Sequence, residues 1–129
     1  MTNLLHKSIT DAIIKSYYNV YNELGYGFLE KVYQNAMFIE LTSLGYKVEA
    51  QKQIKVYYKN NLVGEYYSDL LVEDKVIVEL KATELLMNVH IAQIMNYLKA
   101  TPIEVGMLLN FGEEKEFKRI IYTNNRKNQ

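Results

Sequence analysis

The sequence predicts one α/β domain in which a mixed β-sheet is flanked by helices. The first third of the chain shows helical apolar spacing, the spacing changes to alternation from Val48 onward, and a further helix separates two later apolar strands. Strands joined by short turns form an antiparallel meander, whereas a helical crossover places the next strand parallel. With 129 residues and 49% hydrophobic content, the chain fits a single domain, residues 1–129, with a core of its own.

Two helices are expected before the sheet. Apolar residues recur at helical spacing from Ser8 to Leu24, and the segment Gly25-Tyr26-Gly27 ends this pattern. A second helix is expected from about Phe28 to Leu44, with Gly45 following as a C-cap residue. The first of these helices is an extra element in front of the core.

Three strands are expected next, as a meander. Val48 to Tyr58 alternates, and Lys59-Asn60-Asn61 is a turn signal because Asn tolerates positive φ. The second strand runs from Leu62 to Val72 and the third from Lys75 to Lys81. The acidic pair at positions 73–74 forms the turn between them.

The last part of the chain supplies the crossover and a sheet edge. A third helix spans about Val89 to Ala100 and ends before Pro102, which cannot continue a helix. Val105 to Phe111 is an apolar strand, and Phe117 to Thr123 is expected as a C-terminal edge strand. The polar tail, residues 124–129, is expected to be frayed.

Composition limits the classes of function. The formal charge is zero, with 15 basic and 15 acidic residues, whereas proteins that bind nucleic acid by charge alone usually carry a basic excess. The absence of cysteine excludes disulfides, thiolate zinc sites and thiol nucleophiles. No apolar run is long enough to span a bilayer, and the start of the chain lacks a signal-peptide pattern. We therefore expect a cytoplasmic protein with no membrane partner.

Twelve tyrosines could stack on nucleic-acid bases. The chain has no tryptophan and only four phenylalanines to fill its core. We therefore expect most of the tyrosines to be core residues.

The segment Asp69–Lys81 places charges in a strand with a buried pattern. Val76 to Leu80 is a β-branched apolar run, yet Glu79 lies inside it and Lys81 follows it. Side chains two apart on a strand share a face, so this carboxylate and ammonium project side by side. Burying either charge alone is costly, so such groups need a partner or a metal. Asp69 precedes the turn, so its strand can bring a second carboxylate alongside.

The turn decides whether the two carboxylates share a face. If it centres between Glu73 and Asp74, Asp69 pairs with Val78 and faces away from Glu79. If it centres on Asp74, Asp69 lies opposite Glu79 on the same face. We predict the second arrangement, through a three-residue loop or a bulge.

Two carboxylates and a lysine on a sheet are the residue types of a divalent-metal phosphodiesterase. Mg²⁺ or Mn²⁺ would take Asp69 and Glu79 as oxygen ligands, with the Leu80 backbone carbonyl as a third. The ion would polarise the phosphoryl oxygen and lower the pKa of a water, while Lys81 orients that water or offsets charge building on phosphorus. An ExK pair alone is more often an exposed salt bridge at a hairpin end, so the interpretation depends on its neighbours.

Residues on the second helix add to this set. Glu30 lies one helical turn after Gly27 and one before Tyr33, so the three form one stripe. Glu30 could reach the metal directly or through water, or it could only favour the positive end of its helix, an effect of about 0.3–1 kcal/mol. Tyr33 is expected to pack against the sheet.

The third helix carries a second polar stripe. Gln93 and Tyr97 flank its apolar positions and are expected to face a cleft at the sheet edge. Both are neutral donors suited to positioning a substrate phosphate or to holding Lys81. His90, on the same stripe, is expected to be a satisfied structural histidine.

The motifs together resemble those of a known superfamily. Gly27 to Tyr33 matches GxxExxY, Asp69 with Glu79-Leu80-Lys81 matches D…ExK, and Gln93 with Tyr97 matches QxxxY. Over nearly the whole chain they resemble the GxxExxY protein family of the PD-(D/E)XK nuclease superfamily, in its RecB-like branch with QxxxY.

The resemblance implies a restriction-endonuclease-like core in the order α-β-β-β-α-β and a Mg²⁺-dependent nuclease. It implies that Glu30 is a metal ligand or accessory acid beside Asp69 and Glu79, and that Lys81 is catalytic. The chain departs from the motif name at Ser68, where the motif has a proline. The expected partner is nucleic acid, DNA rather than RNA.

Two other functions stay open from the sequence. A nuclease-fold module that binds nucleic acid or regulates without chemistry would agree with the zero net charge. The other is a structural module in which the acidic residues and the lysine simply pair with one another. The complete acid–acid–lysine set favours the enzyme, because an inactive site has no reason to keep costly inward charges.

Overall fold

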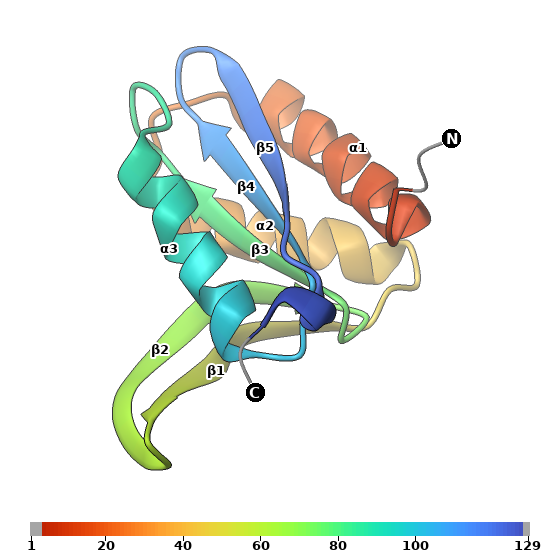
Figure 1. Cartoon of the computed structure of the whole chain (residues 1–129). Helices are drawn as coiled ribbons and strands as arrows, with labels where there is room; N and C mark the ends of the chain where they lie inside the picture. The colour runs from red at the N-terminus through yellow and green to blue at the C-terminus, as the bar shows by residue number, and fades with distance from the viewer. Residues whose placement is uncertain (1–3, 128–129) are drawn as a thin grey trace.

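A five-stranded sheet lies between two layers of helices in the computed structural model, which describes residues 4–127 (Figure 1). The strand order β1-β2-β3-β4-β5 follows the chain, with α1 and α2 on one face and α3 on the other. The expected class, a mixed sheet flanked by helices, is confirmed. The elements are α1 (Lys7–Leu24), α2 (Glu30–Ser43), β1 (Val48–Tyr58), β2 (Asn61–Val72), β3 (Val76–Lys81), α3 (Asn88–Ala100), β4 (Val105–Phe111), β5 (Lys115–Ile121) and a 3-10 helix (Asn124–Arg126).

The connections account for the direction of each strand. β1, β2 and β3 pair antiparallel because only short turns join them, and β3 pairs parallel with β4 because α3 carries the chain back across the sheet. β5 begins at Lys115, opposite Phe111, earlier than the expected Phe117, because a three-residue turn already brings the chain alongside β4. No helix within residues 4–127 is long and apolar enough to cross a membrane.

An apolar core forms on each face of the sheet. On β3, Val76, Val78 and Leu80 belong to the core under α1 and α2, whereas Ile77 belongs to the core under α3. β4 is buried along its whole length. The continuous apolar runs of these two strands are therefore explained by burial on both faces. Glu79, on the same strand, is consequently buried.

α2 begins at Glu30, two residues later than expected, because Tyr33 holds the preceding loop. The hydroxyl of buried Tyr33 donates to the Gly25 carbonyl at 2.7 Å and accepts from the Phe28 N–H at 3.1 Å. Its ring stacks on Phe111 with 4.1 Å between centroids. Tyr33 therefore packs against the sheet, as expected, and it determines where Glu30 starts the helix.

The polar tail that was expected to be frayed makes contacts with the rest of the domain at residues 124–127. Residues 124–126 form a 3-10 helix. The Asn124 N–H donates to the Glu104 carboxylate at 2.7 Å, and the Lys127 ammonium donates to the carbonyls of Thr101 and Ile103. These contacts tie the end of the chain to the loop before β4. Residues 128–129 lie outside the described residues.

Most tyrosines lie outside the core, contrary to expectation. Of the twelve, three are buried, namely Tyr17, Tyr33 and Tyr97. Those that expose a large part of their surface are Tyr18, Tyr26, Tyr57, Tyr58, Tyr66 and Tyr67. Aliphatic side chains supply most of the core instead. Four exposed tyrosines are concentrated on the hairpin formed by β1 and β2.

Gly112, directly after β4, is expected to tolerate no side chain. A Cβ there would lie 2.3 Å from the Thr83 carbonyl oxygen and 3.0 Å from the amide nitrogen of Asn110, which itself donates to that oxygen at 2.9 Å. Gly112→Ala should therefore lower the free energy of unfolding by about 1–3 kcal/mol, measured with urea. Gly64→Ala is the matched control, since its Cβ meets the Tyr66 side chain at 3.3 Å. Equal losses in the two variants would contradict this prediction.

Candidate functional site

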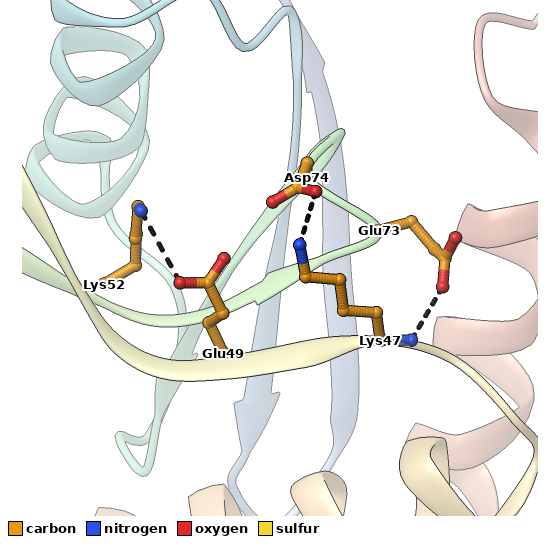
Figure 2. Close-up of polar contacts among 5 residues, drawn as sticks. All are labelled: Lys47, Glu49, Lys52, Glu73 and Asp74. Atoms are coloured by element: carbon orange, nitrogen blue, oxygen red, sulfur yellow. Dashed lines mark hydrogen bonds and ion pairs between the residues drawn. The ribbon is translucent and has the colours of Figure 1, made fainter.

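The turn between β2 and β3 fixes the register of the candidate site. Figure 2 shows its residues Glu73 and Asp74 held by Lys47, which precedes β1. The Lys47 N–H donates to the Glu73 carboxylate at 2.6 Å, and the Glu73 N–H donates back to the Lys47 carbonyl at 2.8 Å. The Lys47 ammonium contacts Asp74 at 2.7 Å. Glu73 and Asp74 both adopt left-handed φ, 55° and 57°, and with Lys75 they form a three-residue loop centred on Asp74, as predicted.

Asp69 and Glu79 face each other where β2 and β3 separate. The ladder between these strands ends with Leu70 paired to Val78, and one position further the same register sets Asp69 opposite Glu79. Side chains replace the backbone pairing there. The Asp69 N–H donates to Glu79 Oε2 and the Leu80 N–H donates to Asp69 Oδ2, both at 2.8 Å. The predicted register is confirmed, and the two residues lie on one face.

Burial makes both carboxyl groups resist ionisation. Glu79 is 4% exposed, and its pKa is raised to about 8, first by burial and then by repulsion from Asp69. Burial likewise raises the pKa of Asp69, against a hydrogen bond from the Leu80 N–H and together with repulsion from Glu30. Attraction from Lys81 lowers the pKa of both groups without offsetting their burial. The pair therefore tends to keep a proton, and a bound cation would stabilise its ionised form.

A distortion in β1 brings Gln51 to the same pair. Gln51 has φ 56°, a value that non-glycine residues rarely adopt, and the β1–β2 ladder skips Gln51 and Asp69. The Gln51 amide donates to Gln34 Oε1 at 2.7 Å, and its hydrogen bond to Asp69 lowers the pKa of that carboxyl. Gln34 is buried on α2, one turn after Glu30. The two glutamines therefore connect α2 to the carboxylate pair.

Neither glutamine was predicted from the sequence to be a site residue. Gln34 had a usable signal, since it follows Glu30 by four residues and shares its helix face. Gln51 has no such signal in the sequence, because its unusual backbone conformation depends on how the β1–β2 hairpin packs against the rest of the domain. Val48 packs in the core under α1 and α2, whereas Ile54, which strict alternation would place on the same face, packs under α3. Gln51, the distorted residue, lies between Val48 and Ile54. At this point the strand turns, so that side chains that would have faced α1 and α2 face α3 instead.

Glu30 approaches the pair from α2 without completing a ligand cluster. It is exposed at the first residue of the helix, and its charge helps to raise the pKa values of Asp69 and Glu79. Within the described part of the chain, no group of three or more His, Cys, Asp or Glu is placed to hold a metal ion. The structure thus brings Asp69, Glu79 and Lys81 together and leaves Glu30 at the rim.

α3 supplies the polar residues that complete the cleft. The Gln93 amide donates to the Tyr97 hydroxyl at 3.1 Å. Burial, followed by repulsion from Glu79, raises the pKa of Tyr97, so this hydroxyl lies within electrostatic reach of the pair. His90 is structural, as expected, because its Nδ1 accepts the Met87 N–H at 3.0 Å at the start of the helix.

Two cavities are lined by candidate residues of the flanking helices, and neither is lined by Asp69, Glu79 or Lys81. One, of about 660 Å³, lies between α3 and the β1–β2 hairpin and is lined in part by Gln93 and Tyr97. The other, of about 550 Å³, is lined in part by Glu30 and by Ala82, which follows Lys81.

The donor set at the pair fits a hard divalent cation. Each carboxylate accepts a hydrogen bond from a backbone N–H, and Asp69 accepts another from the Gln51 amide, which leaves further oxygen lone pairs for coordination. The N–H and C=O of one strand residue point to the same side, so the Leu80 carbonyl is directed toward Asp69 rather than toward β4. A cation would also remove the repulsion that raises the pKa of Glu79.

Comparison with known proteins gives a family and a fold. The family model described as the PD-(D/E)XK nuclease superfamily matches residues 7–120. Among solved structures, "Crystal structure of SSO0001" is similar in fold, with a TM-score of 0.57 at 13% identity over 72% of this chain and 50% of that chain. The present chain thus spans about half the length of that protein. No curated protein matches the sequence. Because the family match covers the chain from α1 into β5, the protein belongs to the PD-(D/E)XK nuclease superfamily.

Proposed function

We propose that this protein is a metal-dependent nuclease that hydrolyses phosphodiester bonds at the Asp69–Glu79 pair. The observation that supports this best is a pair of carboxylates on adjacent strands, one of them almost fully buried, each of which accepts a hydrogen bond from a backbone N–H of the other strand. Membership of the superfamily suggests nuclease activity and a nucleic-acid substrate. The GxxExxY pattern at Gly27–Tyr33 and the QxxxY pattern at Gln93–Tyr97 support the finer assignment to the GxxExxY family in the RecB-like branch.

Asp69, Glu79 and the Leu80 carbonyl are the proposed ligands for Mg²⁺ or Mn²⁺. When bound, such an ion supplies polarisation of the phosphoryl oxygen and a lower pKa for the attacking water. The backbone N–H groups of Asp69 and Leu80 hold the two carboxylates in place. Glu30 is proposed to act as an accessory acid through a water, because it is exposed at the rim and does not form a three-ligand group with the pair.

Lys81 is the proposed catalytic lysine. It shares a face of β3 with Glu79, is partly buried, and attracts both carboxylates. Its ammonium can orient the attacking water and offset the charge that develops on phosphorus. Gln93 and Tyr97 are proposed to position the substrate phosphate, since each carries a polar hydrogen and both lie beside the pair.

Cleavage assays with Lys81→Ala test this proposal. Labelled DNA and RNA, single- and double-stranded, are incubated with Mg²⁺, Mn²⁺ or EDTA. Wild type should cleave with metal and not with EDTA, and Lys81→Ala should be slower by roughly 10²–10³-fold because it loses a charge aimed at the reacting phosphate. Lys75→Ala, an exposed lysine on the turn before the same strand, is the matched control and should keep the wild-type rate.

Failure to cleave any of these substrates would contradict the proposal, as would equal rates for Lys81→Ala and wild type. Oligonucleotide binding without cleavage would instead favour a nuclease-fold binding module.

A further inference from the structure

The larger cavity beside the site is lined by aromatic rings. Its volume, about 660 Å³, falls within the roughly 300–1,000 Å³ that is typical of ligand sites. Tyr57 and Tyr66 on the β1–β2 hairpin are 59% and 50% exposed, and they lie across the cavity from residues of α3. We call this feature the tyrosine groove and define it by Tyr57, Tyr66, Gln93, Asn96 and Tyr97.

The hairpin extends beyond the rest of the sheet to form this groove. Where β2 leaves β3, the β1–β2 hairpin continues as two strands that curve beside α3 (Figure 1). After the distortion at Gln51, Ile54 packs into the core under α3, and its ladder partner Tyr66 shares that face. The Tyr66 ring lies 5.8 Å from the Tyr97 ring. A two-stranded projection that exposes aromatic rings is typical of an interaction surface.

The groove is connected to the candidate site through Gln93 and Tyr97 and carries little charge. Gln93 and Tyr97 belong to both, and repulsion from Glu79 contributes, after burial, to the raised pKa of Tyr97. Lys99 is the only charged side chain among the described residues that line the groove. A groove for the phosphate backbone would need several cations. The lining instead suits an uncharged base, with tyrosine rings for its faces and the side-chain amide of Asn96 for an edge.

We infer that the tyrosine groove is a base-binding subsite that holds an unpaired base of the substrate, so that single-stranded nucleic acid is the substrate class. The inference rests on the proposed function, because it places the scissile phosphate at the Asp69–Glu79 pair. Stacking also explains how a chain with zero net charge holds a polyanion. A base in a duplex must first leave the stack to enter such a groove, so duplexes bind more weakly.

Binding experiments test the groove separately from catalysis. Fluorescence anisotropy is measured on the Glu79→Gln protein with a labelled single-stranded oligothymidylate, the same backbone without bases, and a duplex of equal length. The single strand should bind about 5- to 100-fold more tightly than either competitor. Tyr66→Leu and Tyr57→Leu should each weaken single-strand binding by a similar factor, because one stacking ring is lost. Tyr66→Phe, which keeps the ring, should bind like its parent.

Tyr67→Leu is the matched control. Tyr67 is the next residue on β2, is 53% exposed and does not line the groove, so single-strand binding should be unchanged. Thermal unfolding of each variant, together with the Tyr66→Phe result, separates loss of stacking from loss of fold.

Three results of the binding experiments would overturn the inference. These are equal affinity for the backbone without bases, equal effects of Tyr66→Leu and Tyr67→Leu, and groove-dependent self-association in place of oligonucleotide binding. If wild type cleaves duplex and single strand equally and Tyr66→Leu changes neither rate, the inference fails while the proposed function stands. If single strands bind through the groove but no substrate is cleaved, the proposed function fails and the base-binding groove stands.

Discussion

Glu79→Gln is expected to lower metal-dependent cleavage by roughly 10³-fold or more. Glutamine is nearly isosteric, and its side-chain oxygen can still accept the Asp69 N–H, so the local structure should be kept. The variant loses the negative oxygen that a hard divalent ion requires. Weaker metal binding removes several kcal/mol of electrostatic stabilisation of the transition state. Because each 1.4 kcal/mol changes the rate about tenfold, this loss corresponds to the expected decrease. Initial rates at increasing Mg²⁺ or Mn²⁺ measure the effect.

Glu65→Gln is the matched control for this prediction. Glu65 is exposed on β2, away from the turn, and undergoes the same change of charge. Asp69→Asn should resemble Glu79→Gln, and the double variant should be little worse than either single variant, since the two residues act as a unit. Wild-type rates for Glu79→Gln at saturating metal would show that the pair is not the metal site.

The metal-free protein is expected to lose stability as the pH rises from about 4.5 to about 8. Burial, followed by repulsion from Asp69, raises the pKa of Glu79 to about 8 from its ordinary value of 4.5, which it keeps in the unfolded chain. Between these values the unfolded chain releases the proton while the native protein retains it, so the free energy of unfolding falls with pH and levels off above about pH 8. Each pKa unit is about 1.4 kcal/mol, so the loss amounts to several kcal/mol. The pKa of Asp69 is also raised, which acts in the same direction.

Chemical unfolding in EDTA at about pH 5 and about pH 9 measures this effect. Glu79→Gln cannot release this proton, so it should be more stable than wild type near pH 9 and differ little near pH 5. Mg²⁺ should raise the unfolding midpoint of wild type near pH 9 and not that of the variant, because the ion binds only the native site. A flat pH profile for metal-free wild type would contradict the prediction.

Local patterns predicted most of the fold because they depend on neighbouring residues. β1 and β4 have the predicted bounds, since alternation and a continuous apolar run define them, and α3 ends before Pro102 as expected. The register of β2 and β3 was also predictable, because a charged three-residue turn centred on Asp74 is a local feature. The bounds of elements that depend on residues distant in the sequence were not predictable from local patterns. The start of α2 depends on the hydroxyl of Tyr33, and the order of residues 124–127 depends on the Glu104 loop.

For the candidate site, the sequence by itself predicted the placement of the residues: Asp69 opposite Glu79 with Lys81 on the same strand face, and Glu30, Gln93 and Tyr97 on the flanking helices. The tertiary structure decided the rest. The β1–β2 hairpin is distorted at Gln51, and Gln34 of α2 accepts a hydrogen bond from that residue. Several tyrosines that composition alone assigned to the core are exposed. The physical reason is that burial and electrostatic environment depend on which distant segments pack together. A strand pattern shows that Glu79 lies within an apolar run, but only the layers packed around β3 raise the pKa of its carboxyl to about 8.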